Sequence, residues 1–395
     1  MTVSVIGLDG GPLPEEARDR LAKASLVTGG IAQLAHPDVP AGAETAVMGD
    51  ASAGIDRIAD HPGDVVVLAA GDPGYFGILR ALRLRGIRPE VLPSRPLVAL
   101  AFAAVAVPWD DAAVVSARAT SLPAVVNACR ALAKVAVLTG RGAGPAELGA
   151  GLDGWPRTLV VVERPGEPDT RVTRCQPAEA AARDWPEPSI VLVFDETRSS
   201  AGPQWTNQVA APPAGFGWTE DRFVHHERTV TRREVRVLAL SLLRPTLGTL
   251  VWDVGAGAGS VGVECAAMRA AVIAIDEDPE ACALVRRNAA AFKVDVRVVQ
   301  GCAPAAYAGL PDPDAVYVGG GGLPALEALV ARRPPTIVAG YADVDRVGSA
   351  RWLLTAAGYE VEGVQVAASR LAETPGGSVR LAAQNPVLLL SGRLR

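Results

Sequence analysis

The sequence has few of the residues that build metal sites and disulfide frameworks. Its 395 residues include five cysteines and four histidines. The cysteines form no C-x-x-C pair, which argues against structural zinc and against a disulfide-bonded secreted domain. Only two histidines, His225 and His226, are adjacent, and the others show no metal-ligand spacing. We therefore expect no bound metal.

Long apolar runs are also missing. The longest covers residues 97–107 and ends at Pro108, whereas a helix that spans a bilayer needs about 20 residues. The opening residues, MTVSVIGLDGG, lack the basic start and the cleavage region of a secretory signal. The net charge of −5 argues against nucleic-acid binding. These absences predict a cytoplasmic protein that binds neither membranes nor nucleic acids.

Lysine is scarce, because only three of the 38 basic residues are lysines and 35 are arginines. A GC-rich genome would produce this excess, together with the matching excess of alanine. Alternatively, some arginines bind carboxylates through two N–H groups, as a polyanionic substrate would require. Composition alone does not decide between these explanations.

The length and the order of apolar segments predict two α/β domains. Residues 1–200 alternate short buried strands with helices, which favours a largely parallel sheet. Residues 201–218 are rich in Gly and Pro and predict a linker. Residues 219–395 show the same alternation and contain seven strand-like segments. The fold class is thus α/β throughout, with a Rossmann-like second domain.

The second domain is organised around one glycine-rich turn. The apolar strand LVWDV at residues 250–254 leads into Gly255, Gly257 and Gly259, and an apolar helix follows. A strand, a glycine turn and a helix N-terminus present backbone N–H groups to a nucleotide-like ligand. The sequence therefore predicts a cofactor site at this turn.

Two cofactors fit the turn, in two registers. For S-adenosylmethionine, an acidic residue ends the strand and the glycines alternate as G-x-G-x-G, which matches Asp253 and residues 255–259. The cofactor contacts predicted in this register are Asp253, Gly255, Ala256, Gly257, Ala258 and Gly259. For a dinucleotide, the pattern G-x-G-x-x-G would use Gly257, Gly259 and Gly262. An NAD-dependent dehydrogenase is therefore the alternative.

The following strand ends carry further candidate residues. Asp276 lies 21 residues beyond Gly255, where a carboxylate can bind the ribose diol of either cofactor. Cys302 and Ala303 follow the third strand and would lie beside the adenine. The fourth strand contains Tyr317 and ends in four glycines, which permit close approach of a broad, flat ligand. The glycines predicted to face the substrate are Gly319, Gly320 and Gly321.

Candidate proton-transfer groups lie on either side of this turn. His225 and His226 can move protons near neutral pH, and Tyr317 would lie where substrate meets cofactor, so these three are the candidate catalytic residues. Thr231 and Glu234 have the spacing of a capping box, which predicts the start of a helix.

Taken in order, the motifs of the second domain resemble the precorrin-6Y C5,15-methyltransferase (decarboxylating) family of cobalamin biosynthesis. The matching stretches are residues 221–223, 231–236, 252–259, 274–276, 301–304, 314–320 and 385–386. The resemblance implies that Thr231, the glycine turn, Asp276 and Ala303 contact S-adenosylmethionine. It also implies methylation of precorrin-6Y at C5 and C15 with decarboxylation of the C12 acetate side chain, which gives precorrin-8X.

The first domain is similar to the tetrapyrrole methylases. The matching stretches are residues 5–7, 10–11, 71–77 and 108–111. This resemblance implies two α/β subdomains and cofactor contacts from Gly7, Gly71, Asp72 and Pro73. Two segments differ from the family pattern. Residues 8–12 read LDGGP where the family has a glycine–proline–glycine run, and residues 93–96 read PSRP where it has proline–glycine–isoleucine–serine.

The implied reaction fits simple physical requirements. A methyl group on a sulfonium needs an in-line carbon nucleophile, so positioning supplies most of the catalysis. The carboxylates of a tetrapyrrole need arginines, and Arg232, Arg233, Arg370 and Arg380 are predicted to bind them. The expected partners are a small tetrapyrrole substrate and further copies of the chain in a homo-oligomer. A tetrapyrrole-binding protein with a degenerate first methylation site is a further alternative.

Overall fold

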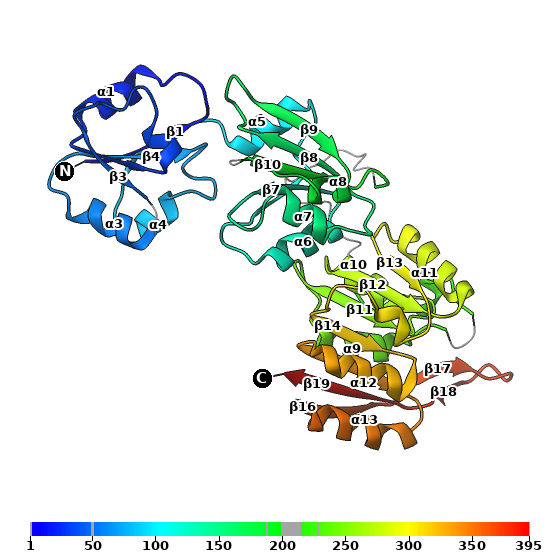
Figure 1. The fold of residues 1–395 in the computed structure, drawn as a ribbon. Helices are drawn as coiled ribbons and strands as arrows, with labels where there is room; N and C mark the ends of the chain where they lie inside the picture. The colour runs from blue at the N-terminus through cyan, green and yellow to red at the C-terminus, as the bar shows by residue number, and fades with distance from the viewer. Residues whose placement is uncertain (1, 49–50, 187–188, 199–214, 227–228, 395) are drawn as a thin grey trace. The chain divides into compact units, whose positions relative to one another are not determined.

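The computed structural model describes residues 2–48, 51–186, 189–198, 215–226 and 229–394 (Figure 1). Contacts divide the chain into two compact units. The first unit comprises residues 1–119, 136–150 and 157–194, and the second comprises residues 120–135, 151–156 and 195–395. Most of the predicted linker at residues 201–218 lies outside the described residues. The domain bounds at residues 200 and 219 therefore stay a prediction.

The first unit contains a five-stranded sheet in the order β3-β2-β4-β1-β5, in which all neighbouring strands run parallel. The strands are β1 (Val3–Leu8), β2 (Leu26–Gly29), β3 (Glu44–Val47), β4 (Val65–Ala70) and β5 (Glu90–Leu92). The helices here are α1 (Glu15–Lys23), α2 (Ile31–Leu34), α3 (Ala51–Asp60) and α4 (Leu79–Leu84). Val5, Val27 and Val67 are buried, as expected for strands covered on both faces.

The second sheet of this part of the chain has the order β6-β7-β10-β8-β9. Its strands are β6 (Ala113–Ser116), β7 (Lys134–Leu138), β8 (Thr158–Glu163), β9 (Arg171–Cys175) and β10 (Ser189–Phe194). The helices are α5 (Leu97–Ala104), α6 (Leu122–Ala131), α7 (Pro145–Gly151) and α8 (Pro177–Ala181), and α6 belongs to the second unit. Two sheets agree with the two subdomains that the resemblance implied.

The expectation of a largely parallel sheet is wrong for this second sheet. β8 runs antiparallel to both β10 and β9. Only residues 164–170 connect β8 to β9, and a parallel pair needs a crossover of about a dozen residues or more. The connection is therefore long enough only for an antiparallel pair.

The second unit contains the seven-stranded sheet that the sequence predicted, in the order β13-β12-β11-β14-β15-β19-β16. Its strands are β11 (Leu250–Val254), β12 (Ala271–Asp276), β13 (Arg297–Gln300), β14 (Ala315–Val318), β15 (Thr336–Tyr341), β16 (Tyr359–Val366) and β19 (Val387–Leu394). The first five strands in this order are parallel, and β19 is antiparallel to β15 and β16. After β13 the chain returns to the other side of β11, so the strand order reverses between β11 and β14.

Helices cover both faces of this sheet. They are α9 (Arg233–Leu243), α10 (Ser260–Ala267), α11 (Pro279–Ala291), α12 (Gly322–Arg332) and α13 (Asp345–Ala356). One apolar core packs α9, α10 and α11 against Val251 and Val272. A second core packs α12 and α13 against Trp252 and Ile273, which point to the opposite face. The strands therefore have no polar face, and ligands meet the sheet at its edge.

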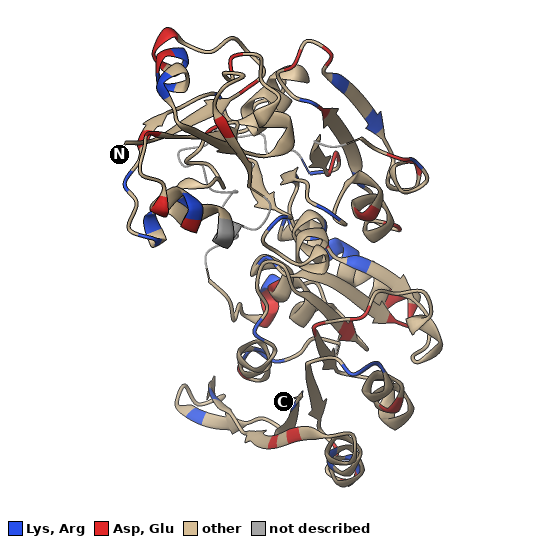
Figure 2. Ribbon diagram, turned by 60° about the vertical axis from the view of Figure 1, so that its left-hand side comes forward, with Lys and Arg blue, Asp and Glu red and all other residues tan. Residues whose placement is uncertain are grey.

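A two-stranded hairpin, β17 (Ser369–Glu373) and β18 (Val379–Ala383), projects between β16 and β19 (Figure 1). The sequence did not predict it. Basic and acidic residues are interspersed over the helices and strands (Figure 2).

Candidate cofactor and substrate sites

The glycine turn after β11 adopts a backbone that glycine takes most readily. Gly255, Gly257 and Gly259 have φ angles of 68°, 56° and 73°, in the left-handed region. A Cβ on Gly255 would lie 2.5 Å from the backbone of Gly320, and one on Gly257 would lie 2.4 Å from the carbonyl oxygen of Thr229. These close approaches explain the G-x-G-x-G spacing.

Asp253 and Gly262 join the strand to the helix beneath this turn. Asp253 is 1% exposed, and its Oδ2 accepts the N–H of Gly262 at 2.8 Å. A Cβ on Gly262 would lie 3.0 Å from the same oxygen. Gly262 therefore serves strand–helix packing, which is also the role of the third glycine in the dinucleotide register. Burial raises the pKa of the Asp253 carboxyl to about 7.

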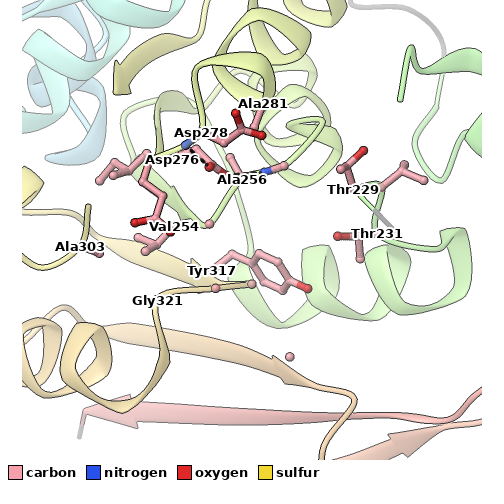
Figure 3. A pocket seen from close by; sticks show the side chains of 18 of the residues that line it. Thr229, Thr231, Val254, Ala256, Asp276, Asp278, Ala281, Ala303, Tyr317 and Gly321 are labelled. Atoms are coloured by element: carbon pink, nitrogen blue, oxygen red, sulfur yellow. Dashed lines mark hydrogen bonds between the residues drawn. The ribbon is translucent and has the colours of Figure 1, made fainter. Parts of the chain in front are cut away.

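A pocket of about 660 Å³ opens where β11, β12 and β14 end (Figure 3). Ligands of open α/β sheets bind outside the carboxyl ends of the strands where the strand order reverses. The predicted residues that line the pocket are Thr231, Arg232, Gly255, Ala256, Gly257, Asp276, Cys302, Ala303, Tyr317, Gly319, Gly320 and Gly321. Asp253, Ala258 and Gly259, which were predicted to contact the cofactor, lie beneath the turn and are not lining residues.

The Asp276 carboxylate ties the end of β12 to the glycine turn. Its Oδ2 accepts the N–H of Gly257 at 2.9 Å, and its Oδ1 accepts the N–H of Asp278 at 3.0 Å. Asp278 in turn accepts the N–H of Glu280 at 2.9 Å and caps α11, as its position before Pro279 predicted. Figure 3 shows Asp276 at the pocket wall beside Ala256. A ribose diol in the pocket can therefore donate hydrogen bonds to a carboxylate that the backbone already orients.

Tyr317 and the glycines after β14 form the opposite wall of the pocket. The Tyr317 hydroxyl points toward the side chain of Thr231 (Figure 3), and it would lie 2.9 Å from a Cβ on Gly340. Burial raises the pKa of this phenol to about 12, so the hydroxyl keeps its proton at neutral pH. Figure 3 shows the ring in the middle of the pocket, with the hydroxyl toward Thr231. Gly320 packs directly on Gly255, so the wall there is bare backbone.

The predicted substrate arginines have different positions. Arg232 lines the pocket, but its guanidinium donates to Oε1 of Gln384 at 3.2 Å and to the carbonyl oxygen of Asn385. Arg370 lies outside the lining and pairs with Glu220 at 2.8 Å and Glu234 at 2.9 Å. Substrate binding by Arg370 is therefore not supported, because two carboxylates of the chain already hold its guanidinium. Arg233 and Arg380 do not line the pocket either.

The capping box predicted at Thr231 and Glu234 is wrong. α9 begins at Arg233 with Arg232 in the N-cap position, and the Arg232 side chain does not cap the helix. Instead, Oε1 of Glu220 accepts the N–H of Arg233 at 2.8 Å. The Glu234 carboxylate pairs with Arg370 of β17, and the Thr231 side chain lies next to Tyr317 (Figure 3). Both capping groups thus have partners distant in sequence. Hydrogen bonds with Arg370 lower the pKa of Glu220 to about 2, against the effect of burial.

The two candidate catalytic histidines lie outside the pocket. Nε2 of His226 is 2.9 Å from Oε1 of Glu280, and both side chains are more than half exposed. Nδ1 of His225 lies 3.2 Å from the carbonyl oxygen of His226. Neither histidine lines the pocket. Of the three candidates, the structure places only Tyr317 at the site.

A buried ion pair that the sequence did not predict supports the pocket wall. Arg236 and Glu264 are both completely buried, and Nε of Arg236 lies 2.6 Å from Oε1 of Glu264. Glu264 also accepts the N–H of Gly217 at 2.6 Å, and Arg236 donates to the carbonyl oxygen of Thr231. The pair therefore fixes the segment that carries Thr231. The sequence signal that could have revealed this pair is one charged residue within the otherwise apolar stripe of each helix.

The first unit has a smaller cavity of about 240 Å³ at the ends of β4, β6 and β7. Of its four predicted cofactor residues, only Asp72 lines this cavity, and its Oδ1 accepts the N–H of Gly74 at 2.7 Å. Gly71 has a φ of 65°. A Cβ on Gly7 would lie 2.6 Å from the carbonyl oxygen of Gly71 and 3.0 Å from Pro73. Gly7, Gly71 and Pro73 therefore pack against one another and determine the backbone of the loop that carries Asp72, but they do not line the cavity.

A second cavity of the first unit, of about 670 Å³, shares Ala70 and Leu97 with the smaller one. Its basic lining residues are Arg18, His36 and Arg164. The sequence did not single out these three residues, because they are dispersed over 147 positions and follow no motif. Two ligands, one in each cavity, would therefore be neighbours at Ala70 and Leu97.

Within the described ranges, no group of three or more His, Cys, Asp and Glu side chains could hold a metal ion. In the same part of the chain, no helix is both long and apolar enough to cross a membrane.

Comparison with known proteins identifies both parts of the chain. Residues 3–181 match the family of tetrapyrrole (corrin/porphyrin) methylases, and residues 221–340 match the precorrin methyltransferase domain. A precorrin-6Y C(5,15)-methyltransferase (decarboxylating) of Sinorhizobium sp. is 35% identical over 333 residues, which cover 82% of this chain and 78% of that protein. A probable cobalt-precorrin-6B C(15)-methyltransferase (decarboxylating) of Pyrobaculum calidifontis is 40% identical over 41% of this chain and 87% of its own length.

The crystal structure of a precorrin-6Y C5,15-methyltransferase from Geobacter metallireducens GS-15 is 28% identical, with a TM-score of 0.43, over 45% of this chain and 97% of that chain. The similarity to the Sinorhizobium protein extends over most of both sequences. The chain is therefore an enzyme of the precorrin-6Y C5,15-methyltransferase (decarboxylating) family.

Proposed function

We propose that this enzyme transfers methyl groups from S-adenosylmethionine to C5 and C15 of precorrin-6Y and removes the carboxylate of the C12 acetate side chain, giving precorrin-8X. The observation that carries the proposal is the pocket at the glycine turn, where Asp276 and bare glycine walls meet in a chain of this family. A dehydrogenase is disfavoured, because the dinucleotide register would bring the pyrophosphate against Gly259, which does not line the pocket.

The residues of the second unit divide the pocket into two parts. Gly255, Ala256 and Gly257 offer backbone toward the amino-acid end of the cofactor, Asp276 binds the ribose diol, and Ala303 borders the adenine. S-adenosylmethionine supplies an electrophilic methyl group on its sulfonium. The glycines at residues 319–321 let a flat macrocycle approach without side-chain collisions. Positioning in this way is the main catalytic contribution that the transfer requires.

Decarboxylation requires a place where a carboxylate loses water and its carbon then gains a proton. Arg232 is the one Lys, Arg or His among the described residues that line the pocket, and its guanidinium already bonds to residues 384–385. An acetate there loses carbon dioxide as its C–C electron pair passes into the conjugated macrocycle. We assign Tyr317 as the group that protonates the remaining carbon, since its hydroxyl is neutral and Tyr317 lines the pocket.

The Tyr317→Phe variant tests this assignment. Proton transfer typically contributes a factor of about 100 or more, so decarboxylation should fall by that factor. Methyl transfer to C15 should change less than about threefold, because the ring remains in place. Released carbon dioxide and incorporated methyl groups are measured on the same samples. Equal losses of both activities would reject a role in protonation.

In the first unit, we assign methylation at C5 to the two adjoining cavities. The smaller cavity, with Asp72, takes the cofactor, and the larger cavity takes the macrocycle. Arg18 is suited to bind its carboxylates, and Arg164, which also pairs with Asp169, lines the same cavity. The shared residues Ala70 and Leu97 mark where the methyl group would cross.

The direct experiment uses the full-length chain, precorrin-6Y and S-adenosylmethionine with a ¹³C-labelled methyl group. The proposal expects labelled methyl groups at both C5 and C15 and the loss of one carbon dioxide, resolved by NMR and mass spectrometry. A single label at C15 would support the alternative of a degenerate first site. A parallel reaction contains NAD in addition, and reduction of NAD with no methyl label in the product would support a dehydrogenase.

We also propose that copies of this chain associate through the β17–β18 hairpin. Leu371, Val379 and Leu381 are 76%, 59% and 66% exposed, and strand alternation places them on one face. A two-stranded hairpin with an exposed apolar face gains stability by packing against a partner. The double variant Leu371→Arg, Leu381→Arg should lower the mass found by sedimentation velocity. If the wild-type chain already has the mass of a monomer, the interface is rejected.

The cytoplasmic location stays a prediction.

A further inference from the structure

One carboxylate joins two loops of the first unit. β1 and β5 are parallel neighbours, so Asp9, which follows β1, and Arg95, which follows β5, lie at the same edge of the sheet. Oδ2 of Asp9 accepts the backbone N–H of Arg95 at 3.2 Å and its Nε at 2.8 Å. Oδ1 accepts the N–H of Gly11 at 3.1 Å. These two loops are the segments in which the sequence differs from the tetrapyrrole methylase pattern.

The loop of residues 9–12 is held on its other side by a second turn. Gly10 has a φ of 82°, and a Cβ there would lie 2.4 Å from the carbonyl oxygen of Gly166. A Cβ on Gly166 would lie 2.1 Å from the carbonyl oxygen of Asp9. The two backbones therefore touch, with no room for a side chain. Since Gly10 and Gly11 line the 670 Å³ cavity, the position of this loop sets one wall of that cavity.

The outer edge of the Arg95 guanidinium has no partner among the described residues. Asp9 takes the Nε edge, and the Arg95 side chain is 61% exposed. Nη2 lies 3.4 Å from the place that a Cβ on Gly11 would occupy, at the rim of the cavity. A guanidinium fixed through Nε can present its two terminal N–H groups to a second carboxylate.

We propose that Arg95 binds a carboxylate of the tetrapyrrole during methylation in the first unit, and that Asp9 is a positioning residue for Arg95 and for the loop of residues 9–12. This inference rests on the proposed function, because it takes a macrocycle with several carboxylates as the ligand of the larger cavity. Arg18 and Arg164 line that cavity, and Arg95 lies beside its lining residue Gly11, so Arg95 would add a third guanidinium at the edge of one ligand. The first unit then selects its substrate by the spacing of carboxylates.

The test uses the full-length chain, in which methylation at C15 is an internal control. Arg95→Ala is expected to raise the KM for precorrin-6Y in C5 methylation about 10- to 100-fold, as for the loss of a hydrogen bond to a charged group. The kcat at C5 should change less than about threefold, and initial rates at C15 should not change. Arg95→Lys should recover part of the loss, because it keeps the charge without the oriented pair of N–H groups. Arg83→Ala, exposed on α4 and outside both cavities, is the matched control.

The role of Asp9 is tested by a double-mutant cycle. Asp9→Asn keeps an acceptor oxygen but removes the charge, so it should raise the KM less than Asp9→Ala does. Once Arg95 is alanine, Asp9→Asn should add little to the KM, because Asp9 acts through Arg95. An unchanged KM in both Arg95→Ala and Arg95→Lys would overturn the inference. A wild-type chain that does not methylate C5 would instead overturn the proposed function.

Discussion

The two units build their candidate sites differently. In the second unit, the glycine turn, Asp276, Ala303 and the glycines at residues 319–321 follow β11, β12, β13 and β14, which belong to one parallel sheet. In the first unit, the smaller cavity is lined by Asp72 after β4, but also by Ser116 of β6 and Leu138 of β7, from another sheet. The site residues of the second unit therefore lie at one edge of one sheet, whereas those of the first unit come from two sheets.

This difference explains why sequence motifs describe the second unit better. Each strand end of a parallel sheet adds a side chain to the same edge, so the order of motifs along the chain already implies their proximity. The lining from β6 and β7 follows no comparable motif. The variants below test whether the two sites are as independent as this comparison implies.

The largest effect is expected from Gly255→Ala. Its left-handed backbone costs a residue with a Cβ about 1–2 kcal/mol, and that Cβ would lie 2.5 Å from the backbone of Gly320. Both walls of the pocket must then move, and misplacement by about 1 Å can cost 100-fold in rate. We expect C15 methylation to fall at least about 100-fold, while C5 methylation measured by NMR of ¹³C-methyl products stays within about twofold.

Gly348→Ala is the control for this variant. Gly348 lies in α13, and a Cβ there would meet no atom within 4 Å. Both methylations should keep their wild-type rates. An equal loss at C5 and C15 in Gly255→Ala would show that the two sites depend on one another.

The next largest effect is expected from Asp276→Ala, with Asp72→Ala as its counterpart in the first unit. Asp276→Ala removes the acceptor for the ribose diol and for the N–H of Gly257, so the KM for S-adenosylmethionine at C15 should rise about 10- to 100-fold. Among the described residues, the Asp72 carboxylate accepts the N–H of Gly74, within its own loop, so Asp72→Ala should raise the corresponding KM at C5 by about 10-fold or less.

These two variants sharpen the comparison because each should affect one methylation only. Initial rates at C5 and C15, measured over a range of cofactor concentrations, give the two KM values from one sample. A rise at both positions in either variant would contradict two separate cofactor sites.

A smaller, pH-dependent effect is expected from Asp253→Asn. Between pH 3.8 and about 7, the folded protein keeps a proton on Asp253 that the unfolded chain releases, so the free energy of unfolding falls as the pH rises. Asn removes this titration, and its carbonyl can still accept the N–H of Gly262. The free energy of unfolding of the variant, relative to that of wild type, should therefore rise by about 1–4 kcal/mol across this pH window. It should not rise further at higher pH.

Differential scanning calorimetry of the full-length chain between pH 4 and pH 8 measures this difference. Glu327→Gln, on the exposed face of α12, should track wild type throughout. A constant difference between Asp253→Asn and wild type over the whole range would contradict the raised pKa. Asp253 lies in the second unit, so the pH dependence should belong to that unit's unfolding transition.

The sequence predicted elements and motifs that depend on near neighbours, and it missed partners that lie far apart in the chain. The turn of residues 255–259, Asp276 and the seven strands could be predicted because local patterns determine them. Glu234 was predicted to cap α9, but it pairs with Arg370, which is 136 residues away. No local pattern carries that information.

The same reason accounts for the missed ion pairs. Arg236 and Glu264 lie in helices whose spacing predicts only apolar faces, and Asp9 and Arg95 are 86 residues apart. The antiparallel β8 was also missed, because strand propensity does not distinguish parallel from antiparallel neighbours. Composition is limited in the same way, as the excess of arginine shows. Arg232, Arg236 and Arg370 all bond within the chain, so the excess did not reveal which arginines are available to substrate.

The smallest effect is expected from His226→Ala. The His226–Glu280 pair is exposed, and such surface pairs contribute less than about 1 kcal/mol. Since neither histidine lines the pocket, C15 methylation and decarboxylation should stay within about twofold of wild type, in contrast to Tyr317→Phe. His225→Ala should behave in the same way, and the double variant tests whether one histidine replaces the other. A loss of more than about tenfold in decarboxylation would instead indicate that the histidine pair, and not Tyr317, transfers the proton. The active site would then extend beyond the ends of the strands in the seven-stranded sheet.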